Sequence, residues 1–399
     1  MIRPKIWMPH RGVTAAFVTA AAVMLAACAS SSPQTEVPDE VATVAPTTAP
    51  TAAPTLTPTP TDESAEGSAV AQAPTEPQAE DFRGIVQWLN SDPLTLEELQ
   101  GRVVLIDFWT YSCINCLRTL PFLRDWHAKY ANQGLTIVGV HSPEFNFEKD
   151  EANVREALIR EQVAWPVAMD NDFATWRAYR NRWWPNKFLI DQDGIVRYNH
   201  IGEGAYEETE HQIRALLTEA GYDVSGIPVG AVVVEEAPDI AMTREIFMGR
   251  GWAFGLYLGN AEEVWVGDLT SFTDSGERAP GKFYLQGHWT ADRESIQHGR
   301  TTEGLEDYIT IEYQAASVNG VMSPAGTEPF AVDVTIDGEP VAEALRGDDT
   351  QVDEAGRTFV LVDANRLYNI IRSAEVGRHV LRLASDSKDF VFYTYTFGS

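Results

Sequence analysis

Residues 102–116 read RVVLIDFWTYSCINC, and their pattern predicts the fold of the surrounding region. Six of the eight residues in 102–109 are apolar, which is typical of a short strand buried on both faces. Cys113 and Cys116 follow at once, and a helical spacing of apolar residues continues to about Tyr130. The stretch therefore predicts a strand, a short turn and a helix, with a cysteine pair at the start of the helix.

The position of this cysteine pair has a chemical reason. A thiolate at a helix N-terminus is stabilised by free backbone N–H groups and by the positive end of the helix dipole. We expect Cys113 to be the exposed nucleophile, and Cys116, one turn further on, to attack the mixed disulfide and release the product. A zinc site would need two more Cys or His ligands at suitable spacing, and the sequence holds no second such pair. A purely structural disulfide across so short a loop would constrain the unfolded chain very little.

The segments that follow alternate between strand and helix patterns. Strands are predicted at 135–140, 187–190 and 195–198, and helices at 153–162, 173–181 and 207–220. The last two strands are joined by Asp191-Gln192-Asp193-Gly194, which is a hairpin turn signal. The order βαβα, β-hairpin, α predicts an α/β domain over residues 82–221.

This domain resembles the thioredoxin fold, in its branch of extracytoplasmic thiol–disulfide oxidoreductases. The residues that carry the resemblance are 104–116, 139–145 and 183–191. They are most similar to the soluble C-terminal part of DipZ-type proteins, with TlpA-like and ResA-like proteins as wider relatives. The resemblance implies an enzyme that exchanges disulfides with protein thiols and needs no cofactor or metal.

Several residue roles follow from this resemblance. Asp107 matches the buried acid that takes or relays a proton as Cys116 becomes a thiolate, although it could be an ordinary carboxylate at a strand end. Pro185 matches a cis-proline that binds the substrate backbone; the alternative is a trans proline at a strand start. Glu144 matches a glutamate near the cysteines of ResA-like proteins, or it is a solvated loop acid. The expected catalytic residues are thus Cys113, Cys116, Asp107 and Glu144.

Two tryptophans complete the expected substrate surface. Trp184 precedes Pro185 directly, and Trp109 ends the strand before the cysteine pair. We assign Trp184, Pro185 and Trp109 to substrate binding; the alternative for Trp109 is a place in the core.

The N-terminal residues predict export and a lipid anchor. Residues 1–27 combine a basic start with an apolar run from Val13 to Leu25 that is too short for a permanent span. The run ends in Leu-Ala-Ala before Cys28, which resembles a bacterial lipobox. Acyl chains on Cys28 would hold the protein to a membrane. Residues 28–81 are rich in Thr, Pro and Ala and predict a disordered tether, so we expect an extracytoplasmic protein anchored to the cell membrane.

The C-terminal region, residues 222–399, carries many short strand patterns. They lie at 283–285, 308–313, 330–336, 358–362, 379–383 and 390–397, with turns expected at 337–338 and 375–377. This spacing predicts an all-β sandwich or jelly roll. DipZ-like proteins are similar here, with a sandwich that resembles carbohydrate-binding modules. Four aromatic residues are either glycan-binding platforms or core: Trp252, Trp265, Trp289 and Tyr308.

Charge and cysteine content limit the partners. The chain has 399 residues, three cysteines and a net charge of −28, which argues against nucleic-acid binding. Without further cysteines for an internal relay, a reductant would need electrons from a membrane thiol transporter similar to CcdA or DsbD. We therefore expect a membrane-anchored reductant of exported disulfides, with a role in cytochrome c maturation among the possibilities.

Two other functions stay open from the sequence. One is a cell-envelope lipoprotein that binds glycan or a partner through the sandwich and carries a secondary redox domain. The other is a peroxiredoxin-like peroxidase, although that chemistry needs a Thr and an Arg beside its cysteine and does not need a second cysteine three positions further on, as Cys116 is here.

Overall fold

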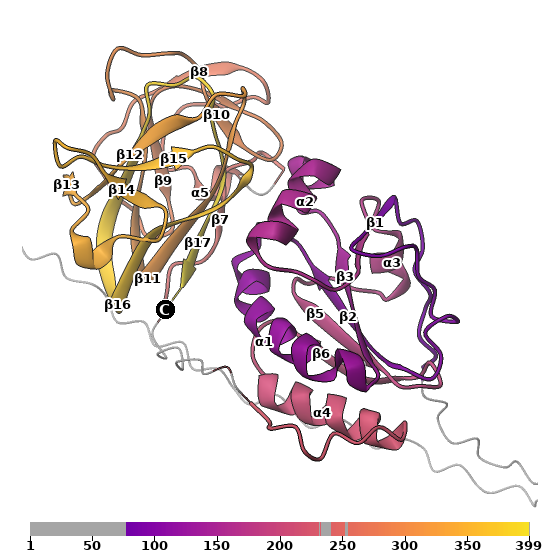
Figure 1. The fold of residues 1–399 in the computed structure, drawn as a ribbon. Coiled ribbons are helices and arrows are strands. Elements are labelled where there is room, and N and C mark those ends of the chain that lie inside the picture. The colour runs from indigo at the N-terminus through magenta and orange to yellow at the C-terminus, as the bar shows by residue number, and fades with distance from the viewer. Residues whose placement is uncertain (1–76, 231, 233–240, 252–253, 399) are drawn as a thin grey trace, which may run out of the picture. The chain divides into compact units, whose positions relative to one another are not determined.

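The computed structural model of the chain describes residues 77–230, 232, 241–251 and 254–398 (Figure 1). The predicted signal peptide, Cys28, most of the predicted tether and Trp252 lie outside these residues. The described residues form two folded parts. We call residues 77–230 the head and residues 241–398 the sandwich.

The head is built on a six-stranded sheet in the order β1-β4-β3-β2-β5-β6. Its central strand β2 (Val103–Trp109) runs parallel to β3 (Leu135–His141) and antiparallel to β5 (Asn186–Ile190). The remaining strands are β1 (Gln87–Leu89), β4 (Val167–Met169) and β6 (Val196–Ile201). The helices are α1 (Ile114–Tyr130), α2 (Glu151–Arg160), α3 (Ala174–Ala178) and α4 (Tyr206–Glu219), with 3-10 turns at Ala131–Gln133 and Asn146–Lys149.

Strand β2 is buried on both of its faces, as its apolar run predicts. Val103 and Leu105 belong to a core cluster that also takes in side chains of α1, α2 and α4. Val104 and Ile106 point to the opposite face, into a cluster that includes Trp176 of α3. Residues 77–79 also join the head, because the amide of Ala79 donates to the carbonyl of Gly194.

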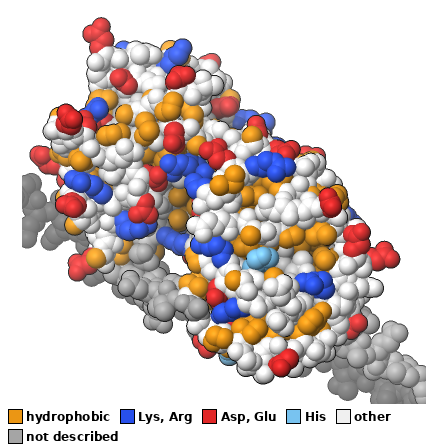
Figure 2. Space-filling view, in the orientation of Figure 1, with side chains coloured by type: hydrophobic (Ala, Val, Ile, Leu, Met, Phe, Trp, Pro, Cys, Tyr) orange, Lys and Arg blue, Asp and Glu red, His pale blue; other side chains and the backbone are white. Residues whose placement is uncertain are grey.

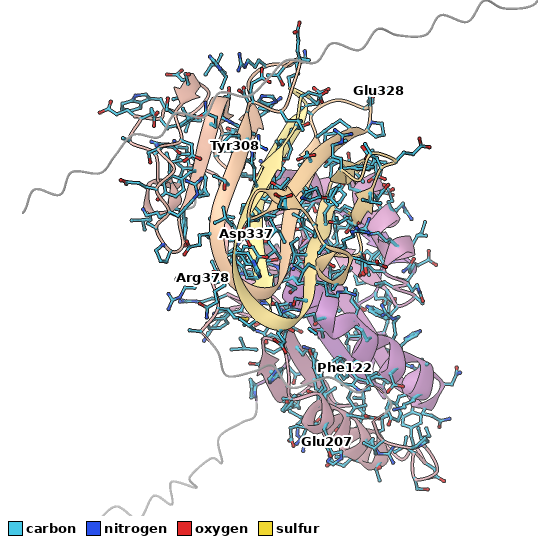
Figure 3. The ribbon with its side chains drawn as sticks, turned by 90° about the vertical axis from the view of Figure 1, so that its left-hand side faces the viewer. Phe122, Glu207, Tyr308, Glu328, Asp337 and Arg378 are labelled. Atoms are coloured by element: carbon cyan, nitrogen blue, oxygen red, sulfur yellow. The ribbon has the colours of Figure 1, made fainter. Side chains whose placement is uncertain are left out.

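Helices α1 and α4 lie against one another (Figure 1). Phe122 of α1 stacks on Tyr206 of α4, with 3.5 Å between ring centroids. Phe122 and Glu207 mark the two helices in Figure 3. This contact anchors the helix whose first turn carries the cysteine pair.

The expected order of strands and helices in the head is correct, but the structure adds two short strands, β1 and β4, that the sequence pattern does not predict. β1 and β4 have three residues each, too few to show a period in the sequence. The helix expected at 173–181 is also shorter: α3 has five residues and begins after Phe173, whose φ of 58° lies in the left-handed region.

The sandwich is a large antiparallel assembly wrapped around one core. Its strands hydrogen-bond in the order β14-β15-β12-β16-β11-β17-β10-β9-β8. β11 pairs with β9 through residues 308–311 and with β17 through 317–324, so the strands close around the apolar cluster between them. The bounds are β7 (Ile246–Phe247), α5 (Phe254–Tyr257), β8 (Leu269–Phe272), β9 (Phe283–Ala291), β10 (Ile296–His298), β11 (Tyr308–Pro324), β12 (Phe330–Ile336), β13 (Glu339–Pro340), a 3-10 turn (Glu343–Leu345), β14 (Thr350–Val352), β15 (Thr358–Val362), β16 (Arg366–Ala384) and β17 (Phe390–Gly398).

The predicted strands of the sandwich are confirmed, two of them with their bounds. β12 and β15 match the expected ranges, and the turn after β12 has positive φ at Asp337 and Gly338, as a tight hairpin requires. Figure 3 labels Asp337 at this turn. The turn expected at 375–377 is wrong: β16 continues through it, and the ladder with β11 shifts register there instead.

The visible surface in Figure 2 mixes acidic and basic side chains. Within the residues that the structure describes, no helix is both long and apolar enough to cross a membrane.

Candidate active site

The cysteine pair lies where β2 passes into α1. Cys113 is the N-cap residue of α1, with extended backbone (φ −81°, ψ 114°), and its carbonyl accepts the amide of Leu117 at 3.0 Å. The first turn of α1 contains no acidic side chain, so nothing within it opposes a negative charge on Cys113. Cys113 is half-buried, whereas Cys116 is only 1% exposed, and both thiols are free. Only Cys113 therefore presents its sulfur to an incoming disulfide.

Cys116 is held as a thiol by its surroundings. Burial raises its pKa well above the usual value, and a hydrogen bond with Cys113 and the charge of Asp107 act in the same direction. A thiol of this kind becomes a nucleophile when a base takes its proton.

Asp107 is a buried carboxyl whose charge acts on Cys116. Its carboxyl is 2% exposed, and its Oδ1 has no hydrogen-bond partner among the described residues. Burial raises its pKa from 3.8 to about 7, while the positive charge of Lys187 acts in the opposite direction. A carboxyl with this pKa can take and return a proton near neutral pH.

The peptide bond between Trp184 and Pro185 is cis. Asn186, the next residue, pairs with Phe108 of β2. Pro185 therefore lies at the end of the sheet where β2 passes into residues 110–113, which we call the cysteine loop. Trp184 is half-buried and donates from Nε1 to the carbonyl of Ser142 at 3.0 Å. The backbone around Pro185 is thus fixed close to the cysteine loop.

Trp109 does not join this surface. It is 1% exposed and packs in the same core cluster as Cys116. Its ring lies 5.6 Å from that of His141, edge to face. The expectation that Trp109 binds substrate is therefore corrected: the side chain has no face to offer, because β2 directs it into the core beneath α1.

Glu144 lies in the loop after β3 and is half-buried. Burial raises its pKa well above the usual value, and the charges of Cys113 and Glu148 add to this effect. The loop acid is therefore within electrostatic reach of the nucleophile, and proximity to Cys113 favours the redox interpretation over that of a solvated carboxylate.

Glu148 is a residue of the site that the sequence pattern does not reveal. It is fully buried and accepts hydrogen bonds from Ser112 Oγ (2.5 Å) and from the amides of Glu144 (2.5 Å) and Phe145 (2.9 Å). One carboxylate thus joins the residue before Cys113 to the loop that carries Glu144. Its partner Ser112 is 36 residues away in the chain, so only the fold brings them together.

Lys187 is a second residue of the site that the sequence-based prediction does not include. It is 1% exposed, and it stands opposite Asp107 in the β2–β5 ladder. A lysine inside the apolar segment Lys187–Ile190 is the signal that could have drawn attention to it, since lysine is seldom fully buried.

Three of the four aromatic candidates of the C-terminal region lie within the described residues, and they differ in exposure. Trp289 is 1% exposed and belongs to the sandwich core, whereas Trp265 is 65% exposed. Tyr308 is half-buried, and the guanidinium of Arg382 lies 4.3 Å from its ring centroid. The core interpretation holds for Trp289, and an exposed aromatic face is present at Trp265.

The described ranges contain no cluster of three or more His, Cys, Asp or Glu side chains suited to a metal ion.

Comparison with known proteins finds two families. Residues 77–217 match the Redoxin family, and residues 243–398 match the family described as thioredoxin like C-terminal domain. Protein DipZ of Mycobacterium bovis is 37% identical over 276 residues, which cover 68% of this chain and 38% of the relative. Thiol-disulfide oxidoreductase YkuV of Bacillus subtilis is 29% identical over 140 residues, 35% of this chain and 93% of the relative. Thiol-disulfide oxidoreductase ResA of Bacillus cereus is 27% identical over 132 residues, 33% of this chain and 73% of the relative.

The chain thus spans 38% of the length of DipZ. The 276 aligned residues exceed the length of either family match, so the likeness to DipZ includes parts of both the head and the sandwich. These matches confirm the fold expected from the cysteine stretch. The chain is a DipZ/TlpA-like protein of the thioredoxin fold, and its head is similar to thioredoxin-like thiol–disulfide oxidoreductases.

Proposed function

We propose that this protein is a membrane-anchored extracytoplasmic reductant of disulfides in exported proteins, with the thiols of apocytochrome c among its products. The observation that carries the proposal is the pairing of a half-buried Cys113 at a helix N-terminus with a buried Cys116 thiol near Asp107. In such a pair one sulfur can attack the substrate disulfide, and the other can release the reduced substrate from the mixed disulfide.

The reaction begins when the thiolate of Cys113 attacks a substrate disulfide. A mixed disulfide forms between Cys113 and the substrate, and the other substrate sulfur leaves as a thiolate. Pro185 and Trp184 hold the substrate backbone beside the cysteine loop. Glu144 serves as a proton donor or acceptor at the mouth of the site.

Cys116 completes the reaction. Its proton passes to Asp107, and its sulfur attacks the Cys113 sulfur of the mixed disulfide. The bond between Cys113 and the substrate sulfur breaks, and this substrate sulfur leaves as a thiolate. Cys113 and Cys116 are then joined by a disulfide. A membrane thiol transporter of the CcdA or DsbD kind returns two electrons, and acylated Cys28 keeps the head at the membrane where that donor lies.

Trapping tests the proposal in cells. The full chain with Cys116→Ser is expected to accumulate as mixed disulfides with exported proteins, which non-reducing gels and mass spectrometry identify. The matched control, Cys113→Ser with Cys116→Ser, should yield none. Equal adducts in both variants would contradict the assignment of Cys113 as the nucleophile.

The direction of transfer needs its own measurement. If the protein is a reductant, cells that carry Cys113→Ser accumulate the trapped substrates in their disulfide form. Accumulation of the same substrates as free thiols would make the protein an oxidant instead.

We propose a second activity for the sandwich, glycan binding at Trp265. The exposed indole borders a cleft of about 340 Å³ that Arg250 and Glu262 also line. The Oε2 of Glu262 is buried and has no hydrogen-bond partner among the described residues. An aromatic face beside an unpaired acceptor suits a sugar ring and its hydroxyl groups.

Sedimentation with purified peptidoglycan tests this second proposal. Trp265→Ala is expected to lower the bound fraction at least five-fold. Val352→Ala, at another exposed apolar position of the sandwich, is the matched control and should bind normally. Equal binding by both variants would refute a role for Trp265.

A further inference from the structure

We propose that Lys187 is a positioning residue for the resolving step: its buried ammonium holds Asp107 as a carboxylate, ready to take the proton of Cys116. The proposal rests on the proposed function, because it concerns the second half of the same disulfide exchange. Its test separates the two halves.

The geometry places the lysine at the back of the site. Asp107 and Lys187 are directly paired residues on adjacent antiparallel strands, so their side chains leave the sheet on the same face. They are 2% and 1% exposed. Cys116, 1% exposed, lies under α1, which packs on this face. Three groups that can carry charge are thus enclosed together.

The ammonium of Lys187 is poorly satisfied by its other contacts. Its Nζ donates one long hydrogen bond, 3.4 Å, to the carbonyl of Gly202. The ring centroid of Tyr206, on α4, lies 5.9 Å from Nζ. Since a lysine ammonium has three protons to donate, packing and hydrogen bonds alone do not explain why a lysine occupies this place.

The electrostatic neighbours of Lys187 are all acidic or aromatic. Burial lowers the pKa of Lys187, and Asp107 on β2, Cys116 on α1 and Glu203 in the loop after β6 oppose this by favouring its charged form. Glu203 is itself 3.5 Å from Arg118 of α1, so its charge is shared. Asp107 has an unpartnered Oδ1, and Lys187 is the cation that lowers its pKa.

The chemical consequence concerns a single proton. Only the carboxylate form of Asp107 can accept the Sγ–H proton of Cys116. The Cys116 sulfur then forms a bond with Cys113 Sγ as the bond between Cys113 Sγ and the substrate sulfur breaks. The bonding electron pair leaves with the substrate sulfur, which takes a proton from water; the two enzyme thiols are oxidised as the substrate disulfide is reduced. Without the lysine charge, burial alone would act on Asp107 and keep it protonated.

The experiment follows the two thiolate products released from the aromatic disulfide DTNB by the reduced full chain. The first release reports attack by Cys113, and the second reports resolution by Cys116. For Lys187→Met we expect an unchanged first phase and a second phase whose pH midpoint rises from near 7 by at least one unit. At pH 7 this lowers the second rate by about five-fold.

Controls separate a positioning role from a structural one. Lys129→Met removes another lysine that pairs with buried and half-buried acids of the head, Asp125 and Glu210, and should leave both phases unchanged. Lys187→Arg keeps the charge and should retain the original midpoint. An unchanged midpoint in Lys187→Met would overturn the proposal, and loss of the first phase in the unaltered chain would instead contradict the proposed function.

A double variant decides the matter if Lys187→Met does not fold. Asp107→Asn with Lys187→Met removes both buried charges, which removes the cost of leaving one unpaired. Its second-phase rate should equal that of Asp107→Asn alone, because the lysine acts through the carboxylate. A further five-fold fall in the double variant would show that Lys187 acts by another route and would overturn the proposal.

Discussion

Asp107→Asn is the substitution whose energetic effect the structure sets most directly. The carboxyl is 2% exposed, and its Oδ1 has no hydrogen-bond partner within the described ranges. Burial raises its pKa from 3.8 to about 7, against the attraction of Lys187. The folded head therefore binds this proton more tightly than the unfolded chain does.

The sign of the pH effect follows from that difference. Because the folded pKa lies above the unfolded one, the native state is favoured at low pH, and its stability falls as the pH rises through the interval from about 4 to about 7. Between pH 5 and pH 8 the unaltered head should lose about 3 kcal/mol for this reason. Asp107→Asn has no such proton. Its free energy of unfolding relative to the unaltered head should therefore grow by about 3 kcal/mol between these two pH values.

The assay must report the head and not the sandwich, since a two-domain chain need not unfold in one step. We suggest urea unfolding of the reduced full chain with pulse proteolysis, in which mass spectrometry quantifies intact β2 and α1 peptides. Asp172→Asn, at an exposed position of the same domain, is the matched control. A relative stability of Asp107→Asn that is equal at pH 5 and pH 8 would refute the idea that burial raises the pKa of this carboxyl in the folded head.

Four further substitutions test the packing and the hydrogen bonds of the two folded parts. Glu148→Gln leaves Ser112 or a loop amide without its charged acceptor and should destabilise the head by about 2 kcal/mol in urea unfolding. Leu123→Ala, in the head core, should cost about 3 kcal/mol, whereas Ile159→Ala, at an 81% exposed position, should stay within about 0.5 kcal/mol of the unaltered protein in the same assay. Hydrogen bonds to Asp307 hold its pKa well below the usual range against burial. Asp307→Asn should therefore lower the sandwich's thermal midpoint at pH 7, with a loss that shrinks below about pH 4, where Asp307 becomes protonated in the unfolded chain but stays ionised in the folded one.

Sequence patterns predict the parts of this fold that show a period or a turn signal. The apolar run of β2 and the alternating strands β12 and β15 are long enough for the pattern to be unambiguous. β1 and β4 are held by pairing with each other and with β3, and their three residues carry no pattern of their own. Tertiary pairing therefore explains what the sequence does not reveal.

The same division holds for the site. The spacing of Cys113 and Cys116 predicts a nucleophile and a resolving thiol. This prediction depends only on local structure, because Cys113 lies at the start of a helix and Cys116 lies one helical turn further on. Glu148 and Lys187 have partners 36 and 80 positions away, Ser112 and Asp107, and only the sheet and its loops bring these together. Trp109 was misassigned for the opposite reason: closeness in sequence to the cysteines does not place a side chain on the surface.

Whether Cys113 and Cys116 reduce a substrate disulfide as a pair can be measured in a single stoichiometric reaction. The reduced full chain is mixed with one equivalent of a peptide that contains one disulfide, and intact masses are recorded after acid quenching. We predict that the peptide gains two hydrogens while the protein loses two, with the new bond mapped to Cys113 and Cys116. Cys113→Ser should leave the peptide oxidised. Reduction of the peptide by Cys113→Ser at the rate of the unaltered chain would contradict the account.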